Sequence, residues 1–280
     1  MEIFFLNRMM QTYPQLMSSR ERLEELYALY HRRELVHPDP LEFLYDYRAL
    51  GDREVVALVA SSLAYGRVAQ ILKSVSTVLK RMDPSPFDFL LKSSFDSLLS
   101  TFADFKHRFT TGQELAALLW GAKCLIEQYG SLYACFTACF NEKDDDVLTA
   151  LSAFVGGFNT CSTKNGSFSL LPSPSKGSAC KRLNLFLRWM VRRDEVDPGG
   201  WNSVPTSKLI VPLDTHMHRI CLRLHLTKRR QADLRTAVDI THAFRRIFPE
   251  DPVRYDFALT RLGIRDDTDL ASFLEAWSTE

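Results

Sequence analysis

Apolar side chains recur every three or four residues along most of the chain, which is the period of an amphipathic α-helix. No alternating strand pattern with a hairpin turn stands out. The sequence therefore predicts an all-α fold. The expected helices cover residues 19–35, 52–66, 67–82, 114–130, 147–158, 180–193, 232–248 and 251–264. For the last of these, Asp251 is the expected N-cap and Pro252 the first helical residue.

Two segments lack this period and flank the helix expected at 180–193. Residues 158–178 are dominated by Ser, Thr, Gly, Pro and Asn, and residues 194–208 contain several further helix breakers. Both are predicted to be loops. The first is either a flexible linker or a functional loop, because long loops inside compact domains often carry function.

The helix at 180–193 has a basic stripe along one side. At 100° per residue, Lys181, Asn184, Arg188 and Arg192 fall together, opposite an apolar face. The stripe is either a solvated surface, with aliphatic stems covering apolar neighbours, or a surface for a polyanion.

Charge is unevenly distributed although the net charge of the 280 residues is only +1. Between Lys176 and Arg246 there are 15 Lys and Arg residues against 6 Asp and Glu residues, a net charge of +9. Such a segment suits a nucleic acid, and the alternative is a solvated helical surface with acidic neighbours elsewhere in the fold.

Other compositional features exclude several classes of protein. No uncharged apolar run reaches the roughly 18 residues of a membrane span. The six cysteines are scattered without a CxxC pair, which argues against a zinc site, an iron–sulfur cluster or a disulfide framework. We therefore expect reduced, buried thiols in a cytosolic protein that carries no metal and no cofactor.

Candidate chemistry centres on Lys181 and Asp214. Each is expected at the start of a helix, where the helix dipole stabilises an anion and destabilises an ammonium ion. A partly desolvated lysine in that position is a candidate nucleophile. Asp214 is either a structural N-cap or a catalytic carboxylate. His216 and His218 follow it, but positions i and i+2 of a helix point in different directions and suit joint metal ligation poorly.

Three stretches carry a resemblance to a known superfamily. They are LVASSLAYGRVAQILKSV (58–75), KGSACKRLNLFLRWM (176–190) and IVPLDTHMHRICLRL (210–224). They resemble, in order, the helix–turn–helix beside the base-binding cleft, the hairpin that ends in the catalytic lysine, and the segment with the catalytic aspartate of helix-hairpin-helix (HhH-GPD) DNA glycosylases. The whole chain also resembles an uncharacterised bacterial family known only by a serial number, which implies no function.

The second stretch departs from the superfamily's hairpin pattern. LPSPSKGSACK keeps Leu171, Pro172 and Gly177 but inserts residues and lacks a second glycine. Lys176 is therefore a rival to Lys181 as the catalytic lysine. Lys181 is preferred because K-R-L-N then keeps the helix phase of the superfamily.

The resemblance implies a two-lobed helical glycosylase-like fold with a central cleft. Residues 51–192 would form a helical barrel lobe that ends in the hairpin motif, and residues 1–50 with 193–280 a second lobe that carries Asp214. The implied function is base-excision repair by a bifunctional DNA glycosylase and AP lyase, with a Schiff base on Lys181 and charge stabilisation by Asp214. The alternatives are an inactive nucleic-acid-binding protein on the same scaffold and a helical adaptor for protein partners.

The resemblance also implies a partner and contact residues. The partner would be damaged double-stranded DNA, bound by a monomer that is cytoplasmic and nucleoid-associated. Tyr65 would fill the gap left by a flipped base, unless it is a core residue. The implied phosphate contacts are Gly177, Ser178, Arg188, Arg192, Arg219 and Arg223.

Overall fold

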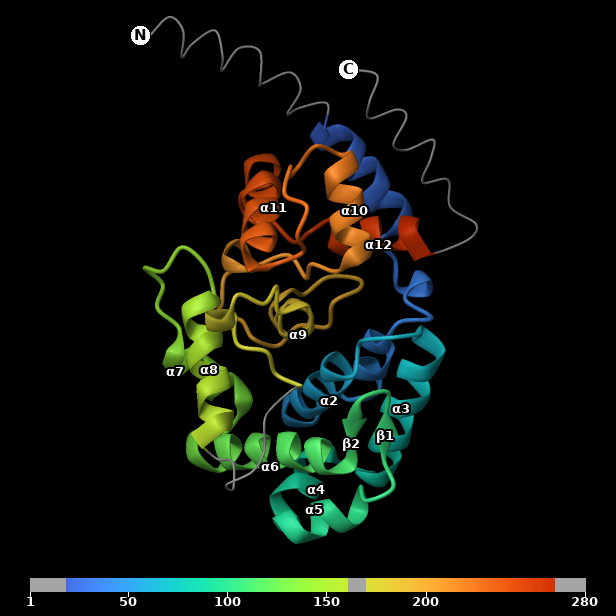
Figure 1. The fold of residues 1–280 in the computed structure, drawn as a ribbon, viewed down its shortest axis with the longest axis vertical. Coiled ribbons are helices and arrows are strands. Elements are labelled where there is room, and N and C mark those ends of the chain that lie inside the picture. Colours follow the sequence, from blue (N-terminus) through green and yellow to red (C-terminus); the bar gives the residue numbers. More distant parts are fainter. Residues whose placement is uncertain (1–18, 161–169, 265–280) are drawn as a thin grey trace, which may run out of the picture.

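The computed structural model describes residues 19–160 and 170–264 (Figure 1). In chain order it contains a helix at 19–30, η1 (Arg33–Leu35), η2 (Pro40–Asp46), α2 (Leu50–Ser62), α3 (Val68–Arg81), α4 (Pro86–Lys92), α5 (Phe95–Thr101), β1 (Lys106–His107), β2 (Thr110–Thr111), α6 (Gly112–Tyr129), α7 (Leu132–Cys139), α8 (Leu148–Thr160), η3 (Pro174–Lys176), α9 (Lys181–Val191), η4 (Thr206–Lys208), α10 (Thr215–Arg223), α11 (Leu234–Ile247) and α12 (Asp256–Ile264). The elements marked η are 3-10 helices. The mainly helical class expected from the sequence is confirmed.

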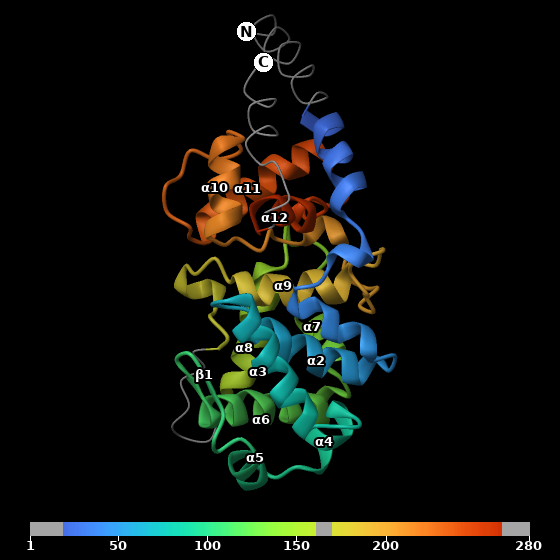
Figure 2. The ribbon, with the colours of Figure 1, turned by 90° about the vertical axis from the view of Figure 1, so that its right-hand side faces the viewer.

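The helices form two groups with α9 between them (Figures 1 and 2). Helices α2 to α8 make up one group, and the helix at 19–30 lies with α10, α11 and α12 in the other. Helix α9 packs directly on α2, and α10 packs on α12. Segment η2, which the resemblance assigned to the second lobe, packs on α2 and α3.

Local sequence explains where the longer helices begin and end. In α6, Thr111 and Glu114 form a capping box, and Gly130 ends the helix with a left-handed φ of 90°. The Ser131 side chain then caps α7 by accepting a hydrogen bond from the Ala134 N–H group. These paired signals let α6 and α7 follow one another with almost no connecting loop.

Two local expectations are corrected. Helix α12 begins at Asp256, so Asp251 lies too far upstream to be its N-cap; the Asp251 carboxylate instead accepts a hydrogen bond of 2.8 Å from Arg192 Nε. A short antiparallel hairpin, β1–β2, was also missed. Its strands have two residues each, too few for an alternating pattern to be visible. Residues 161–169 of the expected loop at 158–178 lie outside the described residues, and α8 extends to Thr160.

Beyond Lys181, which is partly exposed, the basic stripe of α9 faces the interior instead of solvent. Arg188 is only 3% exposed, and its Nε lies 3.2 Å from Asp197 Oδ1 while its Nη1 contacts Asp256 of α12. Asn184, one turn earlier, is also buried. The stripe therefore joins α9 to the second group of helices through charge pairs.

Arg192 completes this buried network. It is 3% exposed and pairs with Asp197, with Asp194 at 2.8 Å and with Asp251 at 2.8 Å. Removing one partner of a buried pair strands the other charge, which costs on the order of 3–5 kcal/mol. The expectation that Arg188 and Arg192 contact DNA phosphates is corrected, because both guanidinium groups are enclosed and neutralised within the protein.

Glu54 is a second buried charge that connects distant segments. It is fully buried on α2 and accepts hydrogen bonds from the Leu132 N–H group (3.0 Å), the Tyr133 N–H group (3.2 Å) and Trp201 Nε1 (2.9 Å). The carboxylate thus lies at the N-terminus of α7 and ties both α7 and the 194–208 segment to α2. Burial raises the pKa of Glu54 to about 7, although the three hydrogen bonds act in the opposite direction.

We expect Glu54→Gln to lower the free energy of unfolding by about 1–3 kcal/mol. The amide replaces one acceptor oxygen by an NH₂ group that faces N–H donors, so buried donors lose their partner. Urea denaturation followed by circular dichroism would measure the change. Glu25→Gln, at an exposed position of the helix at 19–30, is the matched control and should change stability by less than about 0.5 kcal/mol. Equal stability of the two variants would contradict the role given to Glu54.

Candidate active site

Lys181 and Asp214 meet in the structure. Lys181 Nζ lies 3.1 Å from Asp214 Oδ2, and the side chains keep 34% and 20% of their exposure. Lys181 is the first residue of α9 and Asp214 is the N-cap of α10, so the pair joins two helix N-termini. The two residues that the sequence selected for their chemistry are therefore in contact and within reach of solvent.

Asp214 uses its two oxygens for different purposes. Oδ1 accepts hydrogen bonds from the N–H groups of His216 (2.9 Å) and Met217 (2.8 Å), which caps α10, while Oδ2 contacts Lys181. The preceding residues, 209–213, are buried and hold the backbone in place. Capping and pairing with an amine are thus compatible roles of one carboxylate.

The surroundings of Asp214 favour its anion. Burial alone would raise the pKa of this carboxyl, but the charge of Lys181 and the Met217 N–H group outweigh burial and hold the pKa below its usual value. Asp214 is therefore ionised at neutral pH. A fixed anion beside an amine can stabilise developing positive charge and can receive a proton.

The residues before α9 fix where Lys181 lies. Gly177 has a left-handed φ of 76° and its carbonyl accepts a hydrogen bond of 3.0 Å from the Leu234 N–H group at the start of α11. Cys180 is also left-handed, with φ 49°, and its thiol donates to the Pro172 carbonyl. Asn184 Nδ2 donates to the Ala179 carbonyl at 3.1 Å. The turn before Lys181 is thus attached to both α9 and α11.

The other predicted contact residues differ in accessibility. Gly177 is exposed and Ser178 half-buried, with Ser178 Oγ accepting from the Cys180 N–H group at 3.2 Å. Arg219 and Arg223 are exposed on α10, and neither forms an ion pair with an acidic side chain of the described residues. Lys176 is exposed at the end of η3, whereas the lysine that contacts Asp214 is Lys181.

Tyr65 is held within the fold. Its hydroxyl donates to the His107 carbonyl at 2.9 Å and lies 2.6 Å from Thr110 Oγ1, which connects the α2–α3 turn to the β-hairpin. The guanidinium of Arg182 lies over its ring at 5.2 Å, and the His107 ring meets it edge-on at 4.7 Å. These contacts agree with a structural tyrosine more than with a side chain that is free to fill a gap in DNA.

The two histidines after Asp214 point to different surroundings. His216 is exposed, whereas His218 is buried with its Nε2 2.8 Å from the Arg229 carbonyl. Across residues 19–160 and 170–264, no three His, Cys, Asp or Glu side chains are grouped to hold a metal ion. The cysteines of these ranges form no disulfide with one another, and none of their helices is long and apolar enough to cross a membrane.

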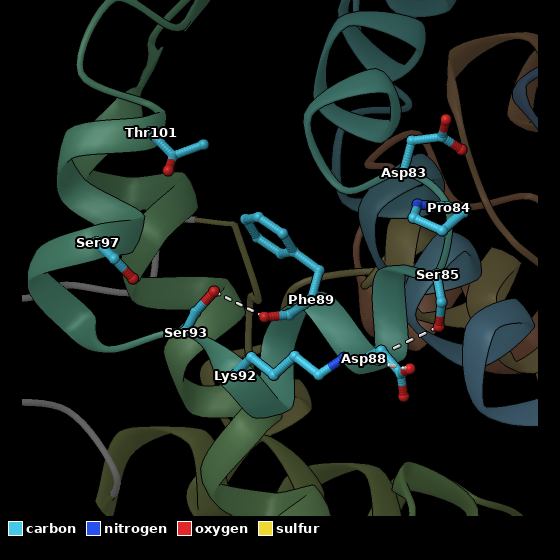
Figure 3. A pocket seen from close by; sticks show the side chains of 9 residues that line it. All are labelled: Asp83, Pro84, Ser85, Asp88, Phe89, Lys92, Ser93, Ser97 and Thr101. Atoms are coloured by element: carbon cyan, nitrogen blue, oxygen red, sulfur yellow. Dashed lines mark hydrogen bonds and ion pairs between the residues drawn. The ribbon is translucent and has the colours of Figure 1, made fainter.

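Three surface pockets lie in the described part of the group of helices formed by α2 to α8, and one of them, of about 400 Å³, lies between the starts of α2, α4 and α7. The first of the other two, of about 420 Å³, lies between α4 and α5, and its polar groups bond to each other: Ser93 Oγ donates to the Phe89 carbonyl, and Lys92 pairs with Asp88 at 3.7 Å (Figure 3). The second, of about 410 Å³, lies between α3 and the β-hairpin and is rich in basic side chains. The lining of this second pocket comes from two separate segments, so the sequence alone gives no sign of it.

Comparison with known protein families gives one match. A family model described as "Protein of unknown function (DUF2400)" matches residues 39–265, which is most of the chain. The chain belongs to the DUF2400 family. The matched residues include the whole of the candidate site, from Tyr65 to Arg223. Searches of curated proteins and of solved structures gave no match.

The two roles of Asp214 can be separated by substitution. Asparagine caps helices as well as aspartate, so Asp214→Asn should lower the free energy of unfolding by at most about 1 kcal/mol, from loss of the partly exposed ion pair. Asp214→Ala should cost about 0.5–2 kcal/mol more, because the cap is lost as well. Urea denaturation of both variants measures the difference, and equal losses would contradict the capping role.

The lowered pKa of Asp214 also predicts a pH dependence. A carboxyl whose pKa is lower in the folded than in the unfolded chain stabilises the fold above the unfolded value and loses this contribution as pH falls through the folded value. The stability advantage of the wild type over Asp214→Asn should therefore be constant near neutral pH and shrink below about pH 4. Urea denaturation of both proteins between pH 7 and pH 3 tests this, and an advantage that grows on acidification would contradict it.

Proposed function

We propose that this protein is a DNA N-glycosylase with AP-lyase activity, in which Lys181 is the nucleophile and Asp214 its partner. The observation that carries the proposal is the contact of 3.1 Å between Lys181 Nζ and Asp214 Oδ2 at a solvent-reachable position. It agrees with the resemblance of three separate stretches to HhH-GPD glycosylases. A buried or distant pair would have removed the basis for this chemistry.

The proposed reaction needs an amine that can attack and an anion that stays ionised. Lys181 Nζ first loses a proton to solvent. Its lone pair then forms a bond to the anomeric carbon, and the base leaves with the electrons of the glycosidic bond and takes a proton from solvent. Opening of the sugar then gives a Schiff base. The carbon next to the imine then loses a proton and the 3′ phosphate departs. This β-elimination cuts the strand. Asp214 would stabilise the positive charge that develops on the sugar.

The charges near the pair suit a polyanionic substrate. Arg219 and Arg223 are exposed on the helix that Asp214 caps, and Lys176 is exposed on the turn before Lys181. The loop after α10 adds exposed Lys228 and Arg230, and it is tied to α10 through His218. Such side chains bind phosphates without reading sequence, which is what an enzyme that searches duplex DNA requires. The excised base is not specified by these contacts.

Borohydride trapping tests the proposal directly. The reagent reduces a Schiff base to a stable amine, so an active lysine becomes covalently joined to DNA. With duplexes that carry an abasic site or one of a panel of damaged bases, we expect a protein–DNA adduct for the wild type and for Lys176→Ala. The adduct should be absent in Lys181→Ala and in Lys181→Arg, which keeps the charge but lacks the nucleophile. Asp214→Asn should slow its formation about 100- to 1,000-fold.

The outcomes discriminate between the readings. An adduct that survives in Lys181→Ala but not in Lys176→Ala would move the nucleophile to Lys176. Salt-sensitive DNA binding without an adduct on any duplex would show an inactive binding protein instead of an enzyme. Absence of DNA binding even at low salt would contradict the proposed enzyme and favour a helical adaptor for protein partners.

A further inference from the structure

The tip of the β1–β2 hairpin presents an unusually exposed aromatic side chain. Phe109 is 83% exposed, more than the two other exposed large hydrophobic residues of the described chain, Leu29 at 59% and Tyr129 at 38%. A single exposed hydrophobic residue is common and needs no explanation by itself. The surroundings of Phe109 are what give it significance.

Contacts with α3 and with the turn between α2 and α3 hold the hairpin in place. His107 is 2% exposed, and its ring lies between Ser74 Oγ, 2.9 Å from Nδ1, and the Tyr65 carbonyl, 3.1 Å from Nε2. A carbonyl can only accept, so Nε2 carries the hydrogen and the Ser74 hydroxyl donates to Nδ1. Burial lowers the pKa of His107, which favours this neutral form. The hydroxyl of Tyr65 also forms hydrogen bonds to both strands of the hairpin. The tip is therefore fixed before any partner binds.

Arg108, beside Phe109, occupies a position that normally selects glycine. Its φ is 52°, a left-handed conformation that costs a side-chain-bearing residue about 1–2 kcal/mol. Its side chain passes over Gly66, where a Cβ atom would lie 2.6 Å from Arg108 Cδ. Two features of the chain, a strained arginine and a glycine that makes room for it, thus place one guanidinium beside the hairpin tip.

Arg108 also lines the basic pocket of about 410 Å³ between α3 and the hairpin. Four basic side chains surround this pocket. Arg81 is neutralised by Asp104, with contacts of 2.6 Å and 2.9 Å. Lys73, Lys106 and Arg108 form no ion pair with an acidic side chain in the part of the chain that the structure describes. The pocket therefore carries unneutralised positive charge, which suits a phosphate group, while the hydroxyls of Ser74 and Thr77 already donate to His107 Nδ1 and to the Lys73 carbonyl.

We infer that the hairpin is a second nucleic-acid contact site, in which Phe109 stacks on an unpaired base and the adjacent pocket binds a phosphate of the same strand. The Arg108 guanidinium lies over the Phe109 ring, 5.7 Å from its centroid, and the side chain still keeps 83% of its exposure. Stacking needs only one aromatic face, whereas docking onto a membrane needs a broad apolar surface. The inference rests on the proposed function for its choice of nucleic acid as the partner. It uses neither Lys181 nor Asp214.

The hairpin is connected to the proposed active site by a short chain of contacts. Arg182, next to Lys181, donates to the Ser62 carbonyl at 3.0 Å and covers the Tyr65 ring, and Tyr65 in turn bonds to both strands of the hairpin. The hairpin and the start of α9 lie on the same side of the molecule (Figure 2). One bound strand could therefore contact both sites.

Binding measurements with a variant that lacks the proposed nucleophile test this inference. In the Lys181→Arg background, fluorescence anisotropy would compare a fully paired duplex with one that contains an unpaired base. Phe109→Ala should weaken binding to the second duplex about 5- to 100-fold, with an unchanged salt dependence. Lys73→Ala and Lys106→Ala should weaken binding to both duplexes and each reduce the slope of log affinity against log salt by about 0.9. Leu29→Ala, the matched control, should bind as its parent does.

Arg108→Gly separates binding from folding. Glycine removes the left-handed strain, so thermal stability should rise while affinity for both duplexes falls. Unchanged affinity in Phe109→Ala, or unchanged salt slopes in both lysine variants, would overturn the inference. So would Phe109-dependent binding to anionic lipid vesicles with no binding to nucleic acid. Hairpin-dependent DNA binding without any borohydride adduct would support this inference and refute the proposed enzyme, whereas an adduct with hairpin-independent binding would do the reverse.

Discussion

Arg188 and Arg192 carry two positive charges into the interior on one side of α9, and the carboxylates that surround them come from the loop after α9 and from the segment that leads into α12. Each charge is tolerable in the interior only while its partners are in place. This requirement fixes α9 relative to α12, and α12 packs on α10. The positions of Lys181 and Asp214, at the starts of α9 and α10, both follow from it.

The Lys181–Asp214 pair differs from that interior network in its exposure. Its members keep 34% and 20% of their side-chain surface, whereas Arg188 and Arg192 keep 3%. A partly exposed ion pair contributes little to stability, so the fold gains little from the contact between Lys181 and Asp214. The contrast within a single helix, with structural charges buried along it and an accessible amine at its first residue, supports a division between residues that position α9 and one that acts chemically.

Much of the helical architecture could be predicted from the sequence because it depends on local signals. The helical period located most of the long helices, and Asp214 was expected at the start of a helix, where the structure shows it as the N-cap of α10. The sequence placed the basic side chains correctly on one side of α9. It did not show that Asp251 and Asp256, from a distant segment, face them. The predicted start of α12 was wrong for the same reason, because contacts with distant segments are not visible in the sequence. Asp251 before Pro252 has the local signature of a cap, yet a buried arginine far away in the chain recruits its carboxylate.

The hairpin and its pocket could not be predicted because they depend on contacts between distant segments. K-H-R-F-T-T contains too few residues for a strand period, and only the fold brings α3 beside it. An arginine followed by phenylalanine gives no sign of a left-handed turn, since glycine or asparagine usually marks one. The pairing of Lys181 with Asp214 was anticipated from chemistry and from the resemblance to glycosylases, whereas the distance between them required coordinates.

The charged packing of α9 also limits how the helix can be misplaced. Apolar side chains can often exchange neighbours at modest cost in free energy. A helix that packs only through apolar side chains therefore tolerates rotation or a shift by one turn. If α9 slipped by one turn, one arginine would occupy the site of the other and the second would lose its counterions, which would leave Asp256 or Asp251 without its partner. Alternative registers are thereby disfavoured, and every correctly folded copy of the chain brings the same amine to the same carboxylate.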